Sequence, residues 1–225
     1  MSLLEEQKAE RRSRILAAAR TLIAARGYDG LTMRDLAHAS RVSVPTLYNL
    51  FGGKHAILLG ELEETIATVT AGFENAQGDG FAARAFGGVE AANEDLLGAP
   101  AYSRELVHLF LVSAETRPLR RQTEERFVAM MAERLTEAQA KGEIVRWVDP
   151  VAVAGREYAH YVQAMIQWAK GDLDADEFRA VAVYGMCLLL LGIARGETAR
   201  VLERRARDLQ PRVGAGRPAD ARKGG

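Results

Sequence analysis

The chain has 225 residues, of which 48% are hydrophobic, and it carries 30 basic and 30 acidic side chains. This composition indicates a globular protein with a sizeable core. Its single cysteine excludes an intramolecular disulfide, no Cys and His spacing indicates a zinc site, and the N-terminus shows no secretory signal. The longest apolar run is too short to span a bilayer, so we expect a cytoplasmic protein without a membrane partner.

The zero net charge conceals two basic segments. Residues 1–55 contain nine basic and five acidic side chains, and residues 199–225 contain eight basic and three acidic ones, so the segment between them is acidic. A basic N-terminal segment indicates a polyanionic partner, although a solvated basic surface is the alternative interpretation.

The first predicted helix covers residues 12–27, where Gly27 supplies a stop signal. Its apolar side chains recur at the i, i+3, i+4, i+7 spacing of one helix face. These side chains are Ile15, Ala18, Ala19, Leu22 and Ile23.

Two short helices are predicted next, over residues 33–40 and 44–51. Thr32 and Ser43 are suitable N-caps for them. Pro45 is tolerated in the second because first-turn N–H groups have no acceptor within the helix. Two glycines end this helix, and a longer amphipathic helix follows over about residues 54–75.

The rest of the chain also reads as helical. Residues 76–100 are rich in Gly and Ala and predict loops around a weak helix. Four longer helices are predicted at about residues 101–116, 119–141, 150–170 and 174–196. No segment alternates with period two, so we expect an all-α protein. Residues 210–225 are rich in Pro, Gly and Arg and predict a disordered basic tail.

The two short helices have the spacing of a helix-turn-helix, because only about four residues, "SRVS", join them. In that motif the second helix lies in the major groove of DNA with its first residues at base edges. Polar side chains that can donate to phosphates or bases gather there. They are Ser43, Thr46, Tyr48, Asn49 and Lys54, whereas Leu36, Ala37, Val42, Leu47 and Phe51 are placed to pack the helices together.

The segment "LTMRDLAHASRVSVPTLYNLFGGKHAIL" resembles the DNA-binding domain of the TetR family of bacterial repressors, over about residues 9–60. The residues that fit the family pattern are Thr32, Leu36, Ala37, Val42, Ser43, Thr46, Leu47, Tyr48, Phe51, Gly53, Lys54 and Ile57. The departures are Ser40 and Arg41 in place of the usual Ala-Gly of the turn, Val44 and Pro45 in place of a polar residue and Gly, and Leu50 in place of His or Tyr.

The resemblance implies roles for the candidate DNA-binding residues. Thr32 and Tyr48 would bind phosphates and Lys54 would reach the DNA backbone. Ser43, Val44, Thr46 and Asn49 would face the groove, and Arg34 and Pro45 complete the set. The alternatives are that Thr32 and Ser43 are only caps, that Tyr48 is a half-buried core aromatic and that Lys54 is a solvent charge.

The resemblance also implies a domain organisation. Residues 1–54 would form the three-helix DNA-binding domain and residues 55–209 a helical ligand-binding and dimerisation domain. The helix at 174–196 is apolar nearly all round, so a partner subunit is its simplest cover. Together with the helix at 150–170 it resembles the pair that forms a four-helix dimer bundle in TetR-type proteins, and a monomeric core is the alternative.

Aromatic and Met side chains of the middle helices would line an inducer pocket by the same resemblance. The candidates are Phe110, Phe127, Met131, Tyr158, Tyr161, Met165 and Trp168. Ordinary core packing is the alternative fate of each. Their character favours a small apolar or aromatic effector.

We therefore predict a ligand-responsive repressor that binds a palindromic operator in double-stranded DNA as a homodimer and is released by a small, apolar molecule. None of the four histidines sits in a nucleophile, metal or acid–base arrangement, so we predict no enzyme activity, no catalytic or metal-binding residues and no cofactor. The alternatives are a helical carrier or enzyme without operator binding, and a family member that acts as an activator.

Overall fold

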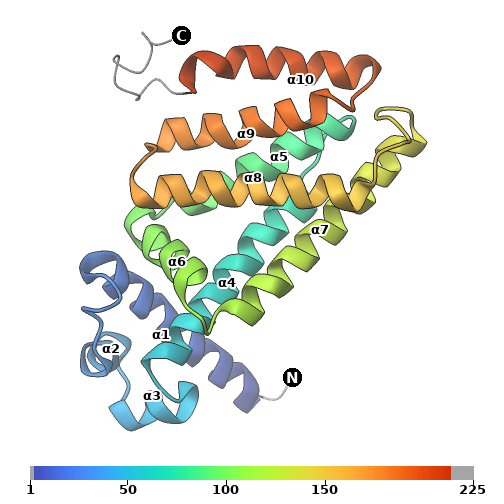
Figure 1. Ribbon diagram of the computed structural model, residues 1–225. Coiled ribbons are helices and arrows are strands. Elements are labelled where there is room, and N and C mark those ends of the chain that lie inside the picture. The colour runs from blue at the N-terminus through green and yellow to red at the C-terminus, as the bar shows by residue number, and fades with distance from the viewer. Residues whose placement is uncertain (1–2, 214–225) are drawn as a thin grey trace. The chain divides into compact units, whose positions relative to one another are not determined.

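The computed structural model describes residues 3–213, and over that range the backbone is helical apart from short connections and an isolated bridge between Ile144 and Ala194. The all-α prediction is confirmed for this range. Its ten α-helices are α1 (Leu3–Arg26), α2 (Met33–Ser40), α3 (Val44–Phe51), α4 (Lys54–Asn75), α5 (Phe81–Leu97), α6 (Pro100–Val112), α7 (Arg117–Ala140), α8 (Pro150–Lys170), α9 (Ala175–Leu191) and α10 (Gly196–Leu209) (Figure 1).

Side-chain caps and glycines fix many of the helix ends. Asp149 accepts from the N–H of Val151 at the start of α8, and Asp174 forms a capping box with Glu177 at the start of α9. Gly171 ends α8 with a φ of 84°, a left-handed conformation that glycine adopts without steric cost. The predicted span of α8 is therefore confirmed at both ends.

The helices group into two compact units. The first contains the chain up to Thr68 together with Gly98–Leu119, and the second contains Val69–Leu97 together with the chain from Arg120 onward. The helix α4 thus contributes its first part to one unit and its last part to the other. The boundary predicted after residue 54 stays a prediction, since these units group α6 with the N-terminal helices.

In unit 1, α1 packs against both α2 and α6, and α2 packs against α3. One apolar cluster fills the interior, built around Ile15, Leu36, Leu47, Ile57 and Leu106, all essentially buried. The spacing of apolar residues predicted for the first helices is what places these side chains on one inner side.

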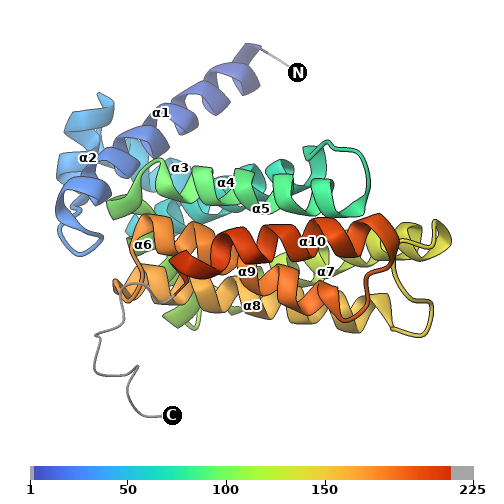
Figure 2. The same cartoon turned by 90° about the horizontal axis from the view of Figure 1, so that it is seen from above.

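In unit 2, α9 lies beside α8 on one side and beside α10 on the other, as both ribbon views show (Figures 1 and 2). The helix α5 packs against α9 and α10. Trp168 is fully buried and stacks on Phe178, with ring centroids 5.3 Å apart. Helices of unit 2 therefore cover α9 on several sides, but Leu188 and Leu189 stay 51% and 41% exposed.

Three sequence-based expectations need correction. Residues 76–100 do not form loops around a weak helix, because Phe81–Leu97 is a continuous helix with eight buried positions. The helix predicted at 174–196 ends at Leu191, where the chain turns into the bridge at Ala194. The helix α10 was not predicted at all.

The predicted tail at 210–225 falls mostly outside the described residues. Its first part, Gln210–Arg212, forms a short 3-10 helix. None of the helices within residues 3–213 combines the length and the apolar character needed to cross a bilayer.

Candidate DNA-binding surface and ligand pocket

The turn between α2 and α3 is closed by an arginine in an uncommon conformation. Arg41 has φ 54° and ψ 46°, and it is the one non-glycine residue with positive φ in the described part of the chain. Its N–H donates to the carbonyls of Ala37 and His38, which ends α2. Ser40 before it is buried, and its hydroxyl donates to the carbonyl of Leu36 at 2.6 Å. Ser40 and Arg41 thus form a turn in which a small buried side chain is followed by a left-handed residue.

Ser43 starts α3 as its N-cap. Its Oγ accepts from the N–H of Thr46 at 3.2 Å, and the two hydroxyls lie 2.8 Å apart. Pro45 falls in the first turn of α3, where the backbone N–H group that proline lacks would have no acceptor within the helix. Leu47 and Phe51 are buried, so the opposite side of this short helix faces outward. The helix is therefore held by its inner side and presents its outer side to solvent.

All nine predicted DNA-binding residues lie in unit 1, on α2, on α3 or beside their ends. Thr32, Arg34, Ser43, Pro45, Tyr48 and Asn49 are exposed, and Val44, Thr46 and Lys54 are partly exposed. Val44 also packs against the apolar cluster. Thr32 and Ser43 are caps, and this role does not exclude a contact of either side chain with DNA. Tyr48 is 50% exposed and is not a core aromatic.

Lys54 is held near the loop before α2. Its Nζ lies 4.2 Å from the centre of the Tyr28 ring and 3.4 Å from the carbonyl oxygen of Asp29. These contacts orient the side chain at the start of α4, so Lys54 is not a freely solvated charge. Its contact with a DNA backbone stays a prediction.

A buried carboxylate joins three helices of unit 1, and sequence patterns did not identify it. Glu61 of α4 is fully buried, and its Oε2 accepts from Arg20 Nε of α1 at 3.1 Å and from the hydroxyl of Tyr102 of α6. Burial raises the pKa of Glu61, while the hydrogen bond from Tyr102 and the charge of Arg20 oppose that rise. The network ties α6 to the first helix of the DNA-binding segment.

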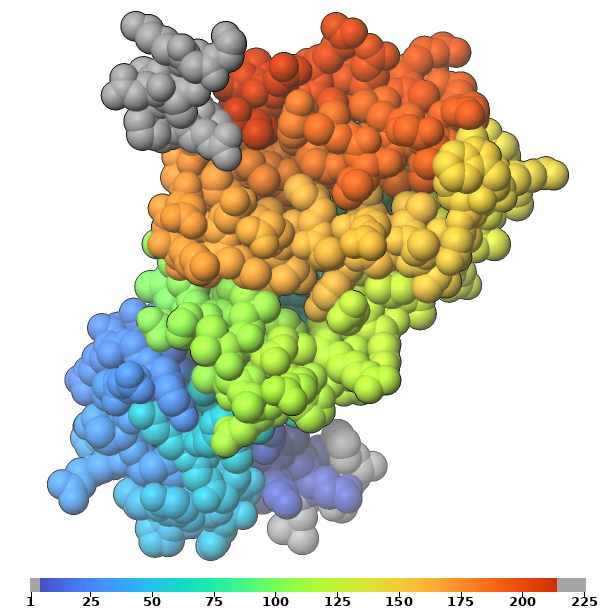
Figure 3. Space-filling model, viewed as in Figure 1, coloured from blue at the N-terminus to red at the C-terminus, as the bar shows by residue number. Residues whose placement is uncertain are grey.

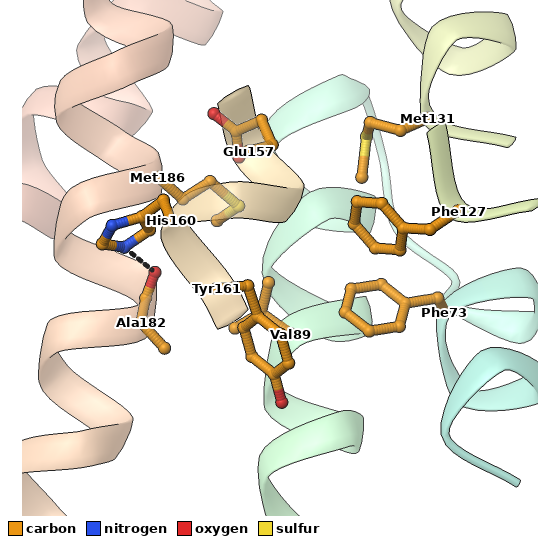
Figure 4. Close-up of a pocket in the computed structure, with 9 residues that line it drawn as sticks. All are labelled: Phe73, Val89, Phe127, Met131, Glu157, His160, Tyr161, Ala182 and Met186. Carbon is orange, nitrogen blue, oxygen red and sulfur yellow. Dashed lines mark hydrogen bonds between the residues drawn. The ribbon is translucent and has the colours of Figure 1, made fainter. Parts of the chain in front are cut away.

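Unit 2 contains a small pocket, enclosed by five helices (Figure 4). Its lining residues are Phe73, Val89, Phe127, Met131, Glu157, His160, Tyr161, Ala182 and Met186. The cavity volume is about 10 Å³, so only a water-sized molecule fits without movement of the side chains. In the view of Figure 4 the aromatic rings of Phe73 and Phe127 lie on one side and His160 on the other.

The pocket is apolar except for three side chains. Tyr161 donates its hydroxyl to Oδ1 of the buried Asn93 at 3.1 Å. His160 Nε2 lies 3.1 and 3.2 Å from the carbonyl oxygens of Val181 and Ala182, which can only accept, so this nitrogen carries the proton. Glu157 is 6% exposed, and burial raises its pKa to about 8.

The structure brings together some of the predicted ligand-binding residues and separates others. Phe127, Met131 and Tyr161 line the pocket, and Tyr158 packs against Phe127 with ring centroids 5.4 Å apart. Met165 and Trp168 are buried in unit 2 outside the lining. Phe110 belongs to the apolar cluster of unit 1 and does not reach this pocket.

Six lining residues were not predicted. These are Phe73, Val89, Glu157, His160, Ala182 and Met186. A signal existed for Glu157, which follows Ala154 by three residues and therefore sits on the inner face of a helix otherwise apolar there. Among the described residues no group of three His, Cys, Asp or Glu side chains is arranged to hold a metal ion.

The comparisons with known proteins agree with this architecture. The family model described as bacterial regulatory proteins of the tetR family matches residues 15–60. A comparison with curated protein sequences found no match.

Solved structures show the same fold over most of the chain. A TetR-family transcriptional regulator from Rhodococcus sp. is 25% identical, with a TM-score of 0.62 over 80% of this chain and 98% of that one. The TetR-family regulator PfmR from Thermus thermophilus is also 25% identical, with a TM-score of 0.59 over 81% and 100%. The regulator FadR from Bacillus subtilis, solved in complex with stearoyl-CoA, is 19% identical, with a TM-score of 0.64 over 80% and 98%.

The matched segment contains the α2–α3 turn and the exposed side of α3 described above, and the likeness of fold continues through the helices of unit 2. Residues 15–60 are thus similar to the tetR family of bacterial regulatory proteins, and the chain shares its fold with solved TetR-family regulators.

Proposed function

We propose that the protein is a cytoplasmic transcriptional repressor that binds a palindromic operator as a homodimer and leaves it when a small, largely apolar molecule binds. The observation that carries the proposal is α3, a short helix held by Leu47 and Phe51 whose outer side exposes Tyr48 and Asn49. A helix of this kind, placed by a tight turn, fits the major groove with its N-terminal residues at base edges.

The candidate residues divide into two roles by chemistry. Asn49 carries an amide that can bond an adenine edge in two places, and Ser43, Thr46 and Val44 stand beside it at the start of α3. Lys54, Tyr48, Thr32 and Arg34 are donors suited to phosphates, which fix position without reading sequence. Pro45 shapes the first turn of α3 between them.

A second copy of the chain is the proposed partner. One eight-residue helix reads too few bases to specify a site, so two-fold pairing on an inverted repeat is expected. Together α8 and α9 form a broad face of unit 2 in the space-filling view (Figure 3). Val151, Leu188 and Leu189 are exposed on these two helices, at 57%, 51% and 41%. Exposed apolar side chains on two neighbouring helices support association between subunits.

The pocket in unit 2 is the proposed effector site. Because α4 carries residues of both units, a molecule that enlarges the pocket around Phe73 can move the helix that leads back to Lys54. Two half-sites one helical turn apart, about 34–36 Å, tolerate little displacement of the reading helices. For release, the effector must bind the conformation that cannot bind DNA more tightly than the conformation that can.

Binding of the full chain to DNA upstream of its own gene, followed by fluorescence anisotropy and footprinting, tests the DNA-binding part. We expect protection of an inverted repeat and an affinity that falls steeply with salt, because phosphate contacts release counterions. Lys54→Ala should weaken binding to operator and random DNA alike, whereas Asn49→Ala should change the preferred bases at a cost of about 1–3 kcal/mol. Lys170→Ala, a lysine at the end of α8, is the matched control. Protection of one asymmetric half-site, or a salt-independent affinity, would contradict the proposal.

Sedimentation equilibrium tests the dimer. Replacing Leu188 and Leu189 together by Glu should shift the protein to monomers, because two charges would have to lose hydration in the interface. Val112→Glu is the control, since this aliphatic side chain on α6 is 68% exposed and lies outside the proposed face. A wild-type monomer at operator-saturating concentration would rule out the homodimer.

A further inference from the structure

Of the three polar side chains that line the pocket of unit 2, Glu157 alone has a buried polar atom without a hydrogen-bond partner within the described residues. Its Oε1 is buried and has no hydrogen-bond partner in the described part of the chain. Tyr161 and His160 are engaged with Asn93 and with the carbonyls of α9. A buried carboxyl oxygen without a partner has lost its hydrogen bonds to water and gained none within the protein, which costs free energy. The pocket is therefore chemically incomplete at this atom.

No charged side chain of the surrounding helices, within the described residues, neutralises Glu157. Glu157 and Arg205 of α10 both lie close enough to Cys187 on α9 to affect the pKa of its thiol. Burial is the main cause of the rise in that pKa. Arg205 is paired with Glu90 of α5 through Nη2, which donates to Oε1 at 2.6 Å, and its buried Nε has no hydrogen-bond partner within the described residues. His160 uses Nε2 on α9, and the lining residues from α4, α5 and α7 are apolar. Within the described residues, no side chain therefore supplies a counter-charge for the ionised form of Glu157.

The opposite side of the pocket suits the body of such a molecule. The rings of Phe73 and Phe127 meet edge to face with centroids 5.1 Å apart, and Tyr161 stands edge to face with Phe73 at 6.0 Å. Aromatic rings attract a cation through their faces and apolar groups through burial. Met131 and Met186 are unbranched and can move aside, which a ligand larger than water requires here.

We propose that the pocket binds an organic cation, a protonated amine on an apolar or aromatic body, whose N–H group donates to Glu157 while its body lies among Phe73, Phe127 and Met131. The inference rests on the proposed function, since it specifies the chemical class of the effector. It narrows that class by charge, because a neutral molecule of the same shape leaves the carboxyl without a counter-ion and an anionic one opposes it.

Binding of this cation requires the carboxyl group to lose a proton. With its pKa raised to about 8, Glu157 carries a proton at neutral pH in the free protein. The ammonium group displaces that proton to the buffer, leaving carboxylate and ammonium in contact. Affinity for the amine therefore rises between about pH 6 and about pH 8, by up to about tenfold per pH unit, and affinity for a neutral analogue does not.

Calorimetric titration of the full chain with phenylbutylamine, phenylbutanol and phenylbutanoate tests the proposal, because the three probes share one apolar body and differ in charge. We expect the amine to bind at least about tenfold more tightly than the alcohol at about pH 8. Binding of each amine should release about one proton at about pH 6 and about half a proton at about pH 8, where half of the carboxyl groups are already ionised. Glu157→Gln should remove that preference, leaving the alcohol within about twofold of its wild-type affinity. Glu133→Gln, an exposed carboxyl on α7, should keep the wild-type pattern.

The outcomes separate this inference from the proposed function. Equal binding of the three probes, tighter binding of the carboxylate, no binding of the amine, or an amine affinity unchanged in Glu157→Gln would overturn the cation proposal. Thermal denaturation of each variant checks that it is folded. Whether the protein is a repressor is decided by DNA binding without any probe, and whether it responds to a ligand by displacement of operator DNA with whichever probe binds.

Discussion

The difference in free energy of unfolding between Glu157→Gln and the wild type should change in favour of the variant as pH rises. The carboxyl group has a pKa near 4.5 in an unfolded chain and about 8 in the folded protein, because burial disfavours its charged form. Below the lower value both states are protonated and the group contributes nothing to the pH dependence. Between the two values the unfolded state alone ionises, so stability is lost progressively as pH rises towards about 8. Above that value the loss is complete and stays constant.

The size of the effect follows from the same shift. At pH 7 the unfolded carboxyl lies about 2.5 units above its pKa, and at about 1.36 kcal/mol per unit the ionisable group costs the wild-type protein roughly 3 kcal/mol. Glutamine has nearly the same shape and never ionises, so it removes this cost. Its amide brings N–H donors that the site does not satisfy, which costs about 1–3 kcal/mol at every pH. The pH slope is therefore the diagnostic quantity, and the offset is not.

Urea denaturation at several pH values between about 5 and about 8, at one protein concentration, measures this slope. The free-energy difference between Glu157→Gln and the wild type should grow by roughly 3 kcal/mol over that interval. Glu133→Gln, the exposed control on α7, should leave the difference flat. A difference for Glu157→Gln that is also flat with pH would show that this carboxyl is ionised in the folded state, and the reasoning from burial would be refuted.

Three further substitutions test other parts of the structure. Arg41→Gly should raise the free energy of unfolding by about 0.5–1 kcal/mol in thermal denaturation, because glycine adopts the left-handed conformation freely, and an equal gain for Arg41→Ala would contradict that cause. Gly185→Ala should lower the free energy of unfolding by about 1–3 kcal/mol, because the His160 ring occupies the place of a Cβ atom at this position. An unchanged melting temperature would contradict this packing. Tyr102→Phe should cost about 1–3 kcal/mol by removing a donor from Glu61, and a neutral result would mean that the carboxyl finds another donor.

The DNA-binding segment was predictable because its determinants are local. The caps Thr32 and Ser43, the glycine at position 52 and the spacing of Leu47 and Phe51 all act within a few residues, and the helix ends confirm them. The sequence also placed α8 correctly at both ends, since Asp149 and Gly171 mark them. Contacts with DNA involve a partner outside the chain, so no pattern within the sequence tests them.

The helix α10 was missed because its apolar stripe is thin. Thr198, Leu202, Ala206 and Leu209 are buried at spacings of four, four and three residues, but charged residues surround them. Its last turn also borders a Pro and Gly rich segment that predicts no structure. The pattern was present, and a count of helical spacing through residues 196–209 would have found it.

The pocket could be predicted only in part, because packing between distant segments decides which aromatic residues line it. Phe127 lines the pocket, while Trp168 is taken up by stacking on Phe178 and Phe110 by the cluster of unit 1. Nothing in the local sequence of these residues separates the three outcomes. The protonation of Glu157 is equally non-local, because its burial depends on helices far along the chain.

The glycines of α5 show how a misleading local signal arises from a long-range requirement. Glycine inside a helix costs about 1 kcal/mol relative to alanine, which is why this segment predicted loops. At Gly88, however, an added Cβ would lie 2.6 Å from Cδ1 of Phe73, closer than carbon atoms can approach. The missing side chain lets the Phe73 ring lie against the backbone of α5, and that ring forms one wall of the pocket. The helix thus loses local stability but makes room for a ring that lines the pocket.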